Sequence, residues 1–274
     1  MRLERTYERV IEEHYQNSRE DYLIYLFHLA TYNFARKYIQ GKCVLDYGCG
    51  SGYGSALIAN DCKQIIGVDI APDAIAYAKD HYQAHKNLSY ETVKPADEAS
   101  LPFTGAIFDT VLSFQVIEHI GDVEPYLSEI HRVLKPGGVF VISTPDRTGR
   151  LFPFQKPWNM YHIKEYSTKD MARTLKKYFS SIHIQRMGGK QEVLEIELAR
   201  TRKLRWMSLP FTLPVIPEIL RINSLRILKR FKKMNQTTLS HHKQQFDFDE
   251  SALLISSAIT RGVNLIAVAY KQLA

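Results

Sequence analysis

Two acidic residues and a run of alternating glycines form the part of this chain that is best suited to binding a ligand. Asp46 is followed by four glycines at every second position, 48, 50, 52 and 54. Glycine has no Cβ, so alternating glycines let the backbone pass close beneath a ligand at a helix N-terminus. Asp69 follows Gly50 by 19 residues. A carboxylate at that spacing, after a second strand, can accept hydrogen bonds from both hydroxyls of a ribose.

Two classes of ligand compete for a turn of this kind. A dinucleotide site has the spacing G-x-G-x-x-G, but the third glycine position falls on Tyr53 when counted from Gly48, and on Ser55 when counted from Gly50. Asp46 would also repel a pyrophosphate. S-adenosylmethionine has no phosphate, and Asp46 would attract its ammonium and sulfonium groups. The turn therefore favours S-adenosylmethionine.

The elements that must position these residues follow an alternating pattern. Short apolar runs predict strands at 43–47, 64–68, 88–93, 108–114, 139–143, 181–186 and 263–270. Amphipathic stretches predict helices at 72–82, 122–134 and 168–178, and helical signals also run through 1–40. Strands that alternate with helices indicate an α/β fold, with a parallel sheet covered on both faces.

The stretch before the last strand breaks this alternation. Prolines at 210, 214 and 217 divide an apolar run, 206–216, from a basic amphipathic helix at 219–231. We therefore divide the chain into an N-terminal helical lid (1–40), a ligand-binding core (41–189), a basic and apolar helical insert (190–260) and a final core strand (261–274).

Between residues 42 and 178, and again in the final strand, the sequence resembles the class I S-adenosylmethionine-dependent methyltransferases. The nucleotide motif of that family matches 44–55, its D-x-x-x-L-P-F element matches 97–103, its fourth-strand motif matches 108–119 and its L-K-P-G-G turn matches 134–138. The resemblance implies a Rossmann-like, doubly wound, seven-stranded sheet with an antiparallel final strand. It also implies S-adenosyl-L-methionine as the cofactor and methyl transfer as the activity. The stretches 27–35, 246–248 and 264–268 resemble O-methyltransferases of glycan and secondary-metabolite pathways.

The resemblance assigns ten residues to the cofactor. They are Asp46, Gly48, Gly50, Gly52, Asp69, Ile70, Asp97, Glu98, Phe114 and Gln115. Asp69 would hold the ribose, Ile70 would pack on the adenine, and Asp97 would accept a hydrogen bond from the adenine amine.

Three further residues are candidates for the transfer step. His119 lies just beyond the fourth strand, and its ordinary pKa near 6.5 suits a general base for a hydroxyl acceptor; alternatively, it caps the strand-to-helix turn. Glu118 would orient His119 or serve as an acid at a helix N-terminus. His162 follows the fifth strand in a loop that tops the acceptor pocket of related enzymes; alternatively, it is a hydrogen-bonded loop histidine.

No essential metal is predicted. Quinone-pathway O-methyltransferases resemble this stretch but carry E-x-x-E-H, which is thought to hold a divalent cation. Gln115 takes the place of the first acid here, which removes a charged oxygen ligand.

Charge suggests where the protein works. The net charge is +7, but 200–233 contains ten Lys and Arg residues and one acid, which leaves +9 there and −2 elsewhere. Basic and apolar residues such as Trp206 and Phe211 suit a peripheral membrane contact, although the insert could equally cap the acceptor pocket. Nucleic acid is less favoured, because no RNA-binding module accompanies the insert.

The expected acceptor is a small molecule or a lipid-linked glycan. The main alternatives are a quinone, lipid or RNA methyltransferase, and a non-catalytic S-adenosylmethionine-binding protein at a membrane. Three cysteines without a C-x-x-C pair, and no apolar leader, point to the cytoplasm, at or near the inner face of the membrane.

Overall fold

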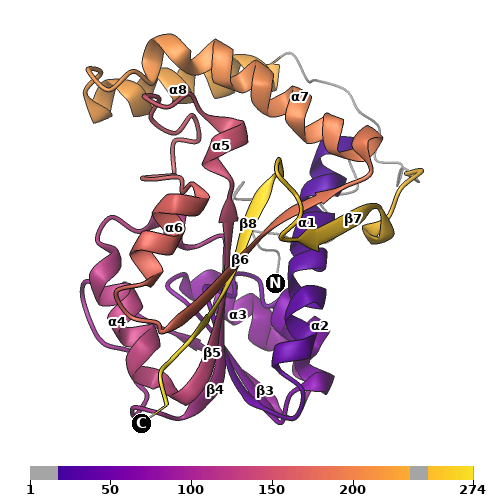
Figure 1. Cartoon of the computed structure of the whole chain (residues 1–274), viewed down its shortest axis with the longest axis vertical. Helices are drawn as coiled ribbons and strands as arrows, with labels where there is room; N and C mark the ends of the chain where they lie inside the picture. The colour runs from indigo at the N-terminus through magenta and orange to yellow at the C-terminus, as the bar shows by residue number, and fades with distance from the viewer. Residues whose placement is uncertain (1–17, 235–245, 274) are drawn as a thin grey trace.

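A computed structural model describes residues 18–234 and 246–273 and has one mixed sheet at its centre (Figure 1). Its strands are β1 (Cys43–Tyr47), β2 (Gln64–Asp69), β3 (Leu88–Thr92), β4 (Phe108–Phe114), β5 (Leu134–Pro145), β6 (Ser181–Gly189), β7 (Leu253–Ser256) and β8 (Asn264–Tyr270). Their order is β3-β2-β1-β4-β5-β8-β6-β7. The pairs among β1 to β5 are parallel, whereas β8 is antiparallel to both β5 and β6.

Helices cover both faces of this sheet. The α-helices are α1 (Arg19–Ala35), α2 (Tyr53–Ile58), α3 (Pro72–His81), α4 (Val123–Val133), α5 (Arg147–Arg150), α6 (Thr168–Leu175), α7 (Gln191–Ser208) and α8 (Glu218–Met234). Single 3₁₀ turns are η2 (Arg36–Tyr38), η3 (Ala59–Asp61), η4 (Ile117–His119), η5 (Leu209–Phe211) and η6 (Glu250–Ala252).

Alternation along the strands builds two cores. Val44 and Leu112 face α1, α2 and the start of α7, whereas their neighbours Leu45 and Val111 face α4 and α6. Successive side chains of a strand point to opposite faces of the sheet. Strands that are apolar at successive positions therefore place apolar side chains on both faces, and helices cover them. The predicted α/β class with a doubly wound sheet is therefore confirmed.

Local signals explain where the helices begin. Pro72 starts α3, where its missing N–H is not needed, and the Asp122 carboxylate caps α4 by accepting from the backbone N–H of Glu124 at 3.0 Å. Ser167 and Asp170 form a capping box at the start of α6. These caps fix the loops that end at the carboxyl edge of the sheet.

The insert differs from the expectation in one respect. It contributes β7, which pairs antiparallel with β6, so the sheet has eight strands rather than seven. Helices α7 and α8 lie across one end of the molecule, next to α5, which follows β5 directly (Figure 1). Among the described residues, no helix combines the length and the apolar character needed to cross a bilayer.

Candidate functional site

The glycine-rich turn between β1 and α2 is shaped by three left-handed residues. Gly48, Gly50 and Gly52 have φ of 80°, 56° and 80°, a region that favours glycine. A Cβ on Gly48 would overlap Val116, and one on Gly52 would meet Ala78 at 2.7 Å. A Cβ on Gly50 would meet nothing within 4 Å. Gly50 is therefore the glycine that faces open space above the turn.

Asp46 is the penultimate residue of β1, and one oxygen of its buried carboxylate accepts hydrogen bonds. Its side chain is 1% exposed, and Oδ2 accepts hydrogen bonds from Ser55 Oγ at 2.6 Å and from Tyr32 Oη at 3.0 Å. Oδ1 is buried and has no hydrogen-bond partner. Burial raises the pKa of Asp46 to about 6, although the hydrogen bonds from Ser55 and Tyr32 oppose that rise. The free oxygen is suited to a cationic donor.

The carboxylate of Asp69 connects the loop after β1 to the loop after β2 through hydrogen bonds. Its Oδ2 accepts from the backbone N–H of Gly50, and its Oδ1 from the backbone N–H of Ala71, each at 2.9 Å. A carboxylate offers about four lone-pair positions, so both oxygens can still accept a ligand hydroxyl. Ile70, beside it, is 57% exposed. This carboxylate is thus held in place at the edge of the sheet.

Asp97 and Glu98 lie on an exposed turn after β3. Burial raises the pKa of Tyr47 to about 12, and the charges of Asp69, Glu129 and Asp97 add to this rise. The charges of Asp69 and Asp97 therefore both influence the ionisation of Tyr47.

The end of β4 lies beside the glycine-rich turn, because β1 and β4 are neighbours. The Phe114 ring meets the Tyr32 ring edge-on, with centroids 4.9 Å apart. Gln115 has φ of 57°, and its backbone N–H donates to the carbonyl of Ser143 at 2.9 Å. A non-glycine residue in this region is uncommon, and such residues occur often at functional sites.

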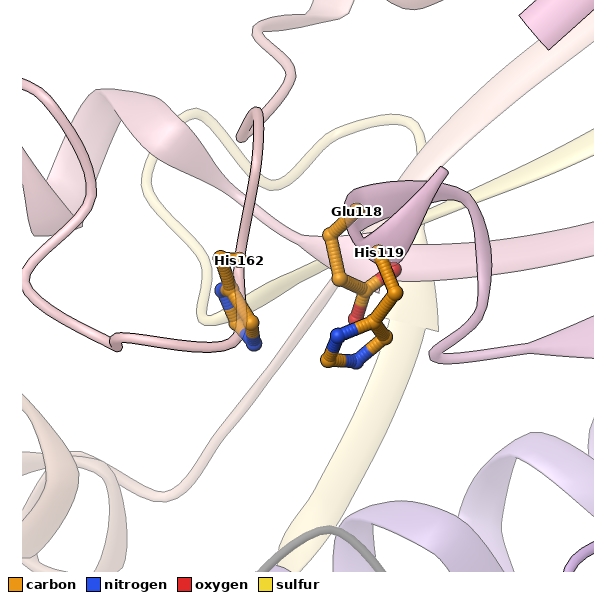
Figure 2. Close-up of side chains that lie close together, drawn as sticks. All are labelled: Glu118, His119 and His162. Atoms are coloured by element: carbon orange, nitrogen blue, oxygen red, sulfur yellow. The ribbon is translucent and has the colours of Figure 1, made fainter. Parts of the chain in front are cut away.

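Glu118, His119 and His162 come together just beyond Gln115 (Figure 2). Their ligand-type atoms all lie within 4.8 Å of one another. Glu118 is 1% exposed; its Oε2 accepts from Thr144 Oγ1 at 2.9 Å, and its Oε1 has no hydrogen-bond partner. Burial raises the pKa of Glu118 against the opposing influence of both histidines. The two imidazole rings meet edge-on, with centroids 4.9 Å apart.

His162 is held by a buried chain of charges. Its Nδ1 lies 2.9 Å from Glu165 Oε1, and Arg150 donates to the two Glu165 oxygens at 3.1 and 3.3 Å. Burial alone would raise the pKa of Glu165, but Arg150 and the His162 hydrogen bond lower it to about 2. Arg150 also reaches Glu197 of α7 at 3.4 Å. The insert is thus connected to the loop that carries His162.

Two of these supports were not predicted as site residues. Tyr32 reaches Asp46 from α1, and Glu165 positions His162. His28, in the predicted N-terminal lid, lies in α1, where burial lowers its pKa to about 4. His14 and Tyr15, both in the predicted N-terminal lid, lie outside the described residues.

Comparisons with known proteins identify related sequences. Residues 45–142 match the family model described as a methyltransferase domain. A probable S-adenosylmethionine-dependent methyltransferase from Mycolicibacterium smegmatis is 34% identical over 172 residues, which cover 63% of this chain and 62% of the relative. A ubiquinone biosynthesis O-methyltransferase from Cereibacter sphaeroides is 37% identical over 114 residues, covering 41% and 45%. The chain therefore spans less than two thirds of the length of these relatives.

A solved structure shares the fold at low identity. It is an S-adenosylmethionine-dependent methyltransferase from Thermotoga maritima, described as a possible histamine N-methyltransferase, with a TM-score of 0.58 at 14% identity. The match covers 93% of each chain. At this identity the likeness concerns the architecture alone.

Proposed function

The chain belongs to the class I S-adenosylmethionine-dependent methyltransferases through its core, residues 45–142, and we propose that it transfers a methyl group to an oxygen acceptor. One observation carries the proposal. The glycine-rich turn after β1 and the cluster of Glu118, His119 and His162 lie at the ends of neighbouring strands, β1 and β4. A donor held over the turn would therefore present its methyl group toward the cluster.

The residues at the turn fit S-adenosylmethionine. The unpartnered Oδ1 of Asp46 suits its ammonium, and the open space above Gly50 leaves room for close approach of the ligand. Asp69 has lone pairs left for the ribose hydroxyls, and the exposed Ile70 offers an apolar surface for the adenine. When bound, the sulfonium supplies an activated methyl group.

The protein has to align the acceptor, exclude water and receive a proton. An alcohol oxygen becomes a good nucleophile as its proton leaves, and we assign that proton to Nε2 of His119. The Nδ1–H of His119 donates to the Tyr161 carbonyl at 3.1 Å, so Nε2 is the basic nitrogen of the neutral ring. Glu118 stabilises the protonated ring, and Gln115 lines the path to the donor.

The insert supports the acceptor side of this site. Gln155 donates to the carbonyl of Arg205 in α7 at 3.0 Å, and the buried Arg221 of α8 donates to the carbonyl of Pro157 at 2.6 Å. Both contacts hold the loop that leads to His162. The insert therefore caps the acceptor pocket in this proposal.

We further propose that the acceptor is a sugar hydroxyl, on a free metabolite or on a glycolipid. Exposed apolar side chains on the same loop, Phe154, Tyr161 and Ile163, would favour an acceptor with an apolar part. The relative named as a ubiquinone biosynthesis O-methyltransferase is compatible with an oxygen acceptor.

The test is a methyl-transfer assay with isotope-labelled S-adenosylmethionine and parallel sets of sugars, glycolipids, phenols and RNA. We expect release of S-adenosylhomocysteine with a hydroxylated sugar or glycolipid, and an O-linked methyl group in the product by mass spectrometry. Binding of S-adenosylmethionine without turnover on any set would favour a non-catalytic role. Turnover on RNA or phenols alone would refute the acceptor class.

A peripheral membrane contact is a second proposal for the insert. Trp206, Val215 and Ile219 are 59%, 82% and 73% exposed, although apolar. Several basic residues of the insert have acidic partners: Arg200 pairs with Glu197 and Arg202 with Glu195. Apolar insertion would therefore act together with the attraction of the remaining basic residues to anionic lipid.

Liposome sedimentation tests this contact. Changing Trp206 and Val215 to Ser should reduce sedimentation with anionic vesicles, whereas Leu273→Ser should not. Leu273 is 76% exposed but packs near Gly137, away from the insert. Absence of sedimentation, or an equal effect of Leu273→Ser, would leave the insert with its capping role alone.

A further inference from the structure

Three side chains direct electron-pair donors at one small space. Glu118 comes from η4 as a carboxylate whose Oε1 is buried and unpartnered, next to His119 on the same turn. His162 approaches from a separate loop on the other side (Figure 2). A buried carboxylate oxygen without a hydrogen-bond donor is costly, unless a positive charge is bound beside it.

One nitrogen of each ring makes a hydrogen bond that fixes the position of the ring hydrogen. The Nδ1 of His162 lies 2.9 Å from Glu165 Oε1, and the Nδ1 of His119 lies 3.1 Å from the Tyr161 carbonyl oxygen. Both partners are acceptors, so each neutral ring carries its hydrogen on Nδ1 and its lone pair on Nε2. Histidines that bind metals are oriented in this way, by a carboxylate or a carbonyl on the second nitrogen.

The support behind His162 is unusually firm for a loop residue. Glu165 is 2% exposed and holds two hydrogen bonds from Arg150, which itself is 8% exposed. This arrangement keeps Glu165 ionised and the ring of His162 in one orientation. A loop histidine that merely packed against its neighbours would not need a buried ion pair behind it.

We infer that Glu118, His119 and His162 form a binding site for a divalent transition-metal cation. Two imidazoles and one carboxylate favour Zn²⁺, Fe²⁺, Co²⁺ or Mn²⁺ over the all-oxygen sites of Mg²⁺ and Ca²⁺. Ligands around a tetrahedral cation with bonds of about 2.1 Å lie about 3.4 Å apart. The ligand atoms lie within 4.8 Å of one another, so they would come closer together when a cation binds.

This inference departs from the sequence expectation of no essential metal. Gln115 removes one acid from the E-x-x-E-H pattern, and on that basis the site loses a ligand. The structure brings in His162, which follows His119 by 43 residues and which no motif pairs with it.

A consequence for catalysis rests on the proposed function, although cation binding itself does not. Three protein ligands leave a coordination position open for an acceptor hydroxyl. In the cation-bound protein His119 would be a ligand, instead of the proton acceptor proposed above for the metal-free protein, and the proton of the hydroxyl, made more acidic by the cation, would be released to water. The oxygen would then form its bond to the methyl carbon, and the electrons of the broken carbon–sulfur bond would remain on sulfur.

Cobalt titration of the untagged, chelator-treated full chain tests the site directly. We expect one Co²⁺ per chain with visible d–d absorption bands, and affinity at least about tenfold weaker in His162→Gln and in Glu118→Gln. His183→Gln is the matched control within the fold, since His183 lies on β6 beside Ser181. A variant with His241 and His242 both changed to Gln controls for a second pair of imidazoles that is adjacent in sequence.

S-adenosylhomocysteine affinity, measured by calorimetry, checks that each variant is folded. Absence of cobalt bands in the wild-type protein would overturn the inference, as would equal binding by His162→Gln and Glu118→Gln when both still bind S-adenosylhomocysteine. Cobalt binding that depends on these residues, without methyl transfer to any acceptor, would support the site and count against the proposed function.

Discussion

The buried carboxylate of Asp46 makes the affinity for S-adenosyl ligands dependent on pH. The size of the effect follows from the pKa of this carboxyl in the ligand-free protein. Its pKa is about 6 in the unliganded protein, because burial outweighs the hydrogen bonds from Ser55 and Tyr32. A ligand ammonium beside Oδ1 would favour the ionised form. Below pH 6, binding must therefore displace a proton, so affinity should fall by about tenfold from pH 7 to pH 5.

Titration calorimetry with S-adenosylhomocysteine measures this dependence, because its amino group stays charged across that range. Asp46→Asn should bind more weakly at pH 7 and should lose the pH dependence. Ser55→Ala is the informative companion variant: it removes a hydrogen bond that lowers the pKa of Asp46, so the midpoint should move to higher pH.

The stability of the unliganded protein provides an independent measurement. Its dependence on pH runs opposite to that of ligand affinity. A raised pKa means that the folded protein holds the Asp46 proton more tightly than the unfolded chain. Asp46 therefore makes the free energy of unfolding fall as pH rises from about 4 to about 6. Asp46→Asn should remove this slope in urea melts of the unliganded protein. Constant wild-type affinity between pH 7 and pH 5, or the same decline in Asp46→Asn, would refute the role assigned to this carboxylate.

Four further substitutions probe the rest of the site. Gly50→Ala should abolish measurable S-adenosylhomocysteine binding in calorimetry, whereas Gly41→Ala should not, although Gly41 has a similar φ of 65° and equally open space around a Cβ. Asp69→Ala should lose about 1–3 kcal/mol of ligand binding, because the ribose hydroxyls lose their acceptor, and unchanged affinity would refute that contact. His119→Ala should keep ligand affinity but lower the methyl-transfer rate about 100-fold or more, and an unimpaired rate would exclude a role for this ring in the transfer step. Arg150→Ala leaves the buried Glu165 with His162 as its remaining partner, so chemical denaturation should show a loss of up to about 3–5 kcal/mol in unfolding free energy; a loss below about 1 kcal/mol would mean that the pair is solvated.

Much of the fold could be predicted because its signals are local. The strand predicted at 108–114 coincides with β4, and the predicted Asp122 cap begins α4 as expected. Each of these elements is specified by a short apolar run or by one capping residue. The first strand and the glycines after it also lie where the spacing placed them.

Other features depend on contacts between distant residues and left no local trace. The short strand β7 forms because β6 offers a free edge, not because 253–256 has a distinctive pattern. His162 reaches Glu118 only through the fold of its loop, which Arg150 and Glu165 hold. The charge sum over 200–233 also overstated the free positive charge, because Glu195 and Glu197 lie just outside that window and pair with residues inside it.

The position of β8 has a consequence for how the chain folds during synthesis. β8 lies between β5 and β6, yet it is translated about 120 residues after the end of β5, so closing that loop carries a large entropic cost. Strands β1 to β5 can pair as the ribosome delivers them, but the apolar edge of β5 must wait for β8. We expect nascent chains arrested before residue 264 to keep this edge exposed and to recruit chaperones, and the released chain, which contains β8, to cover it.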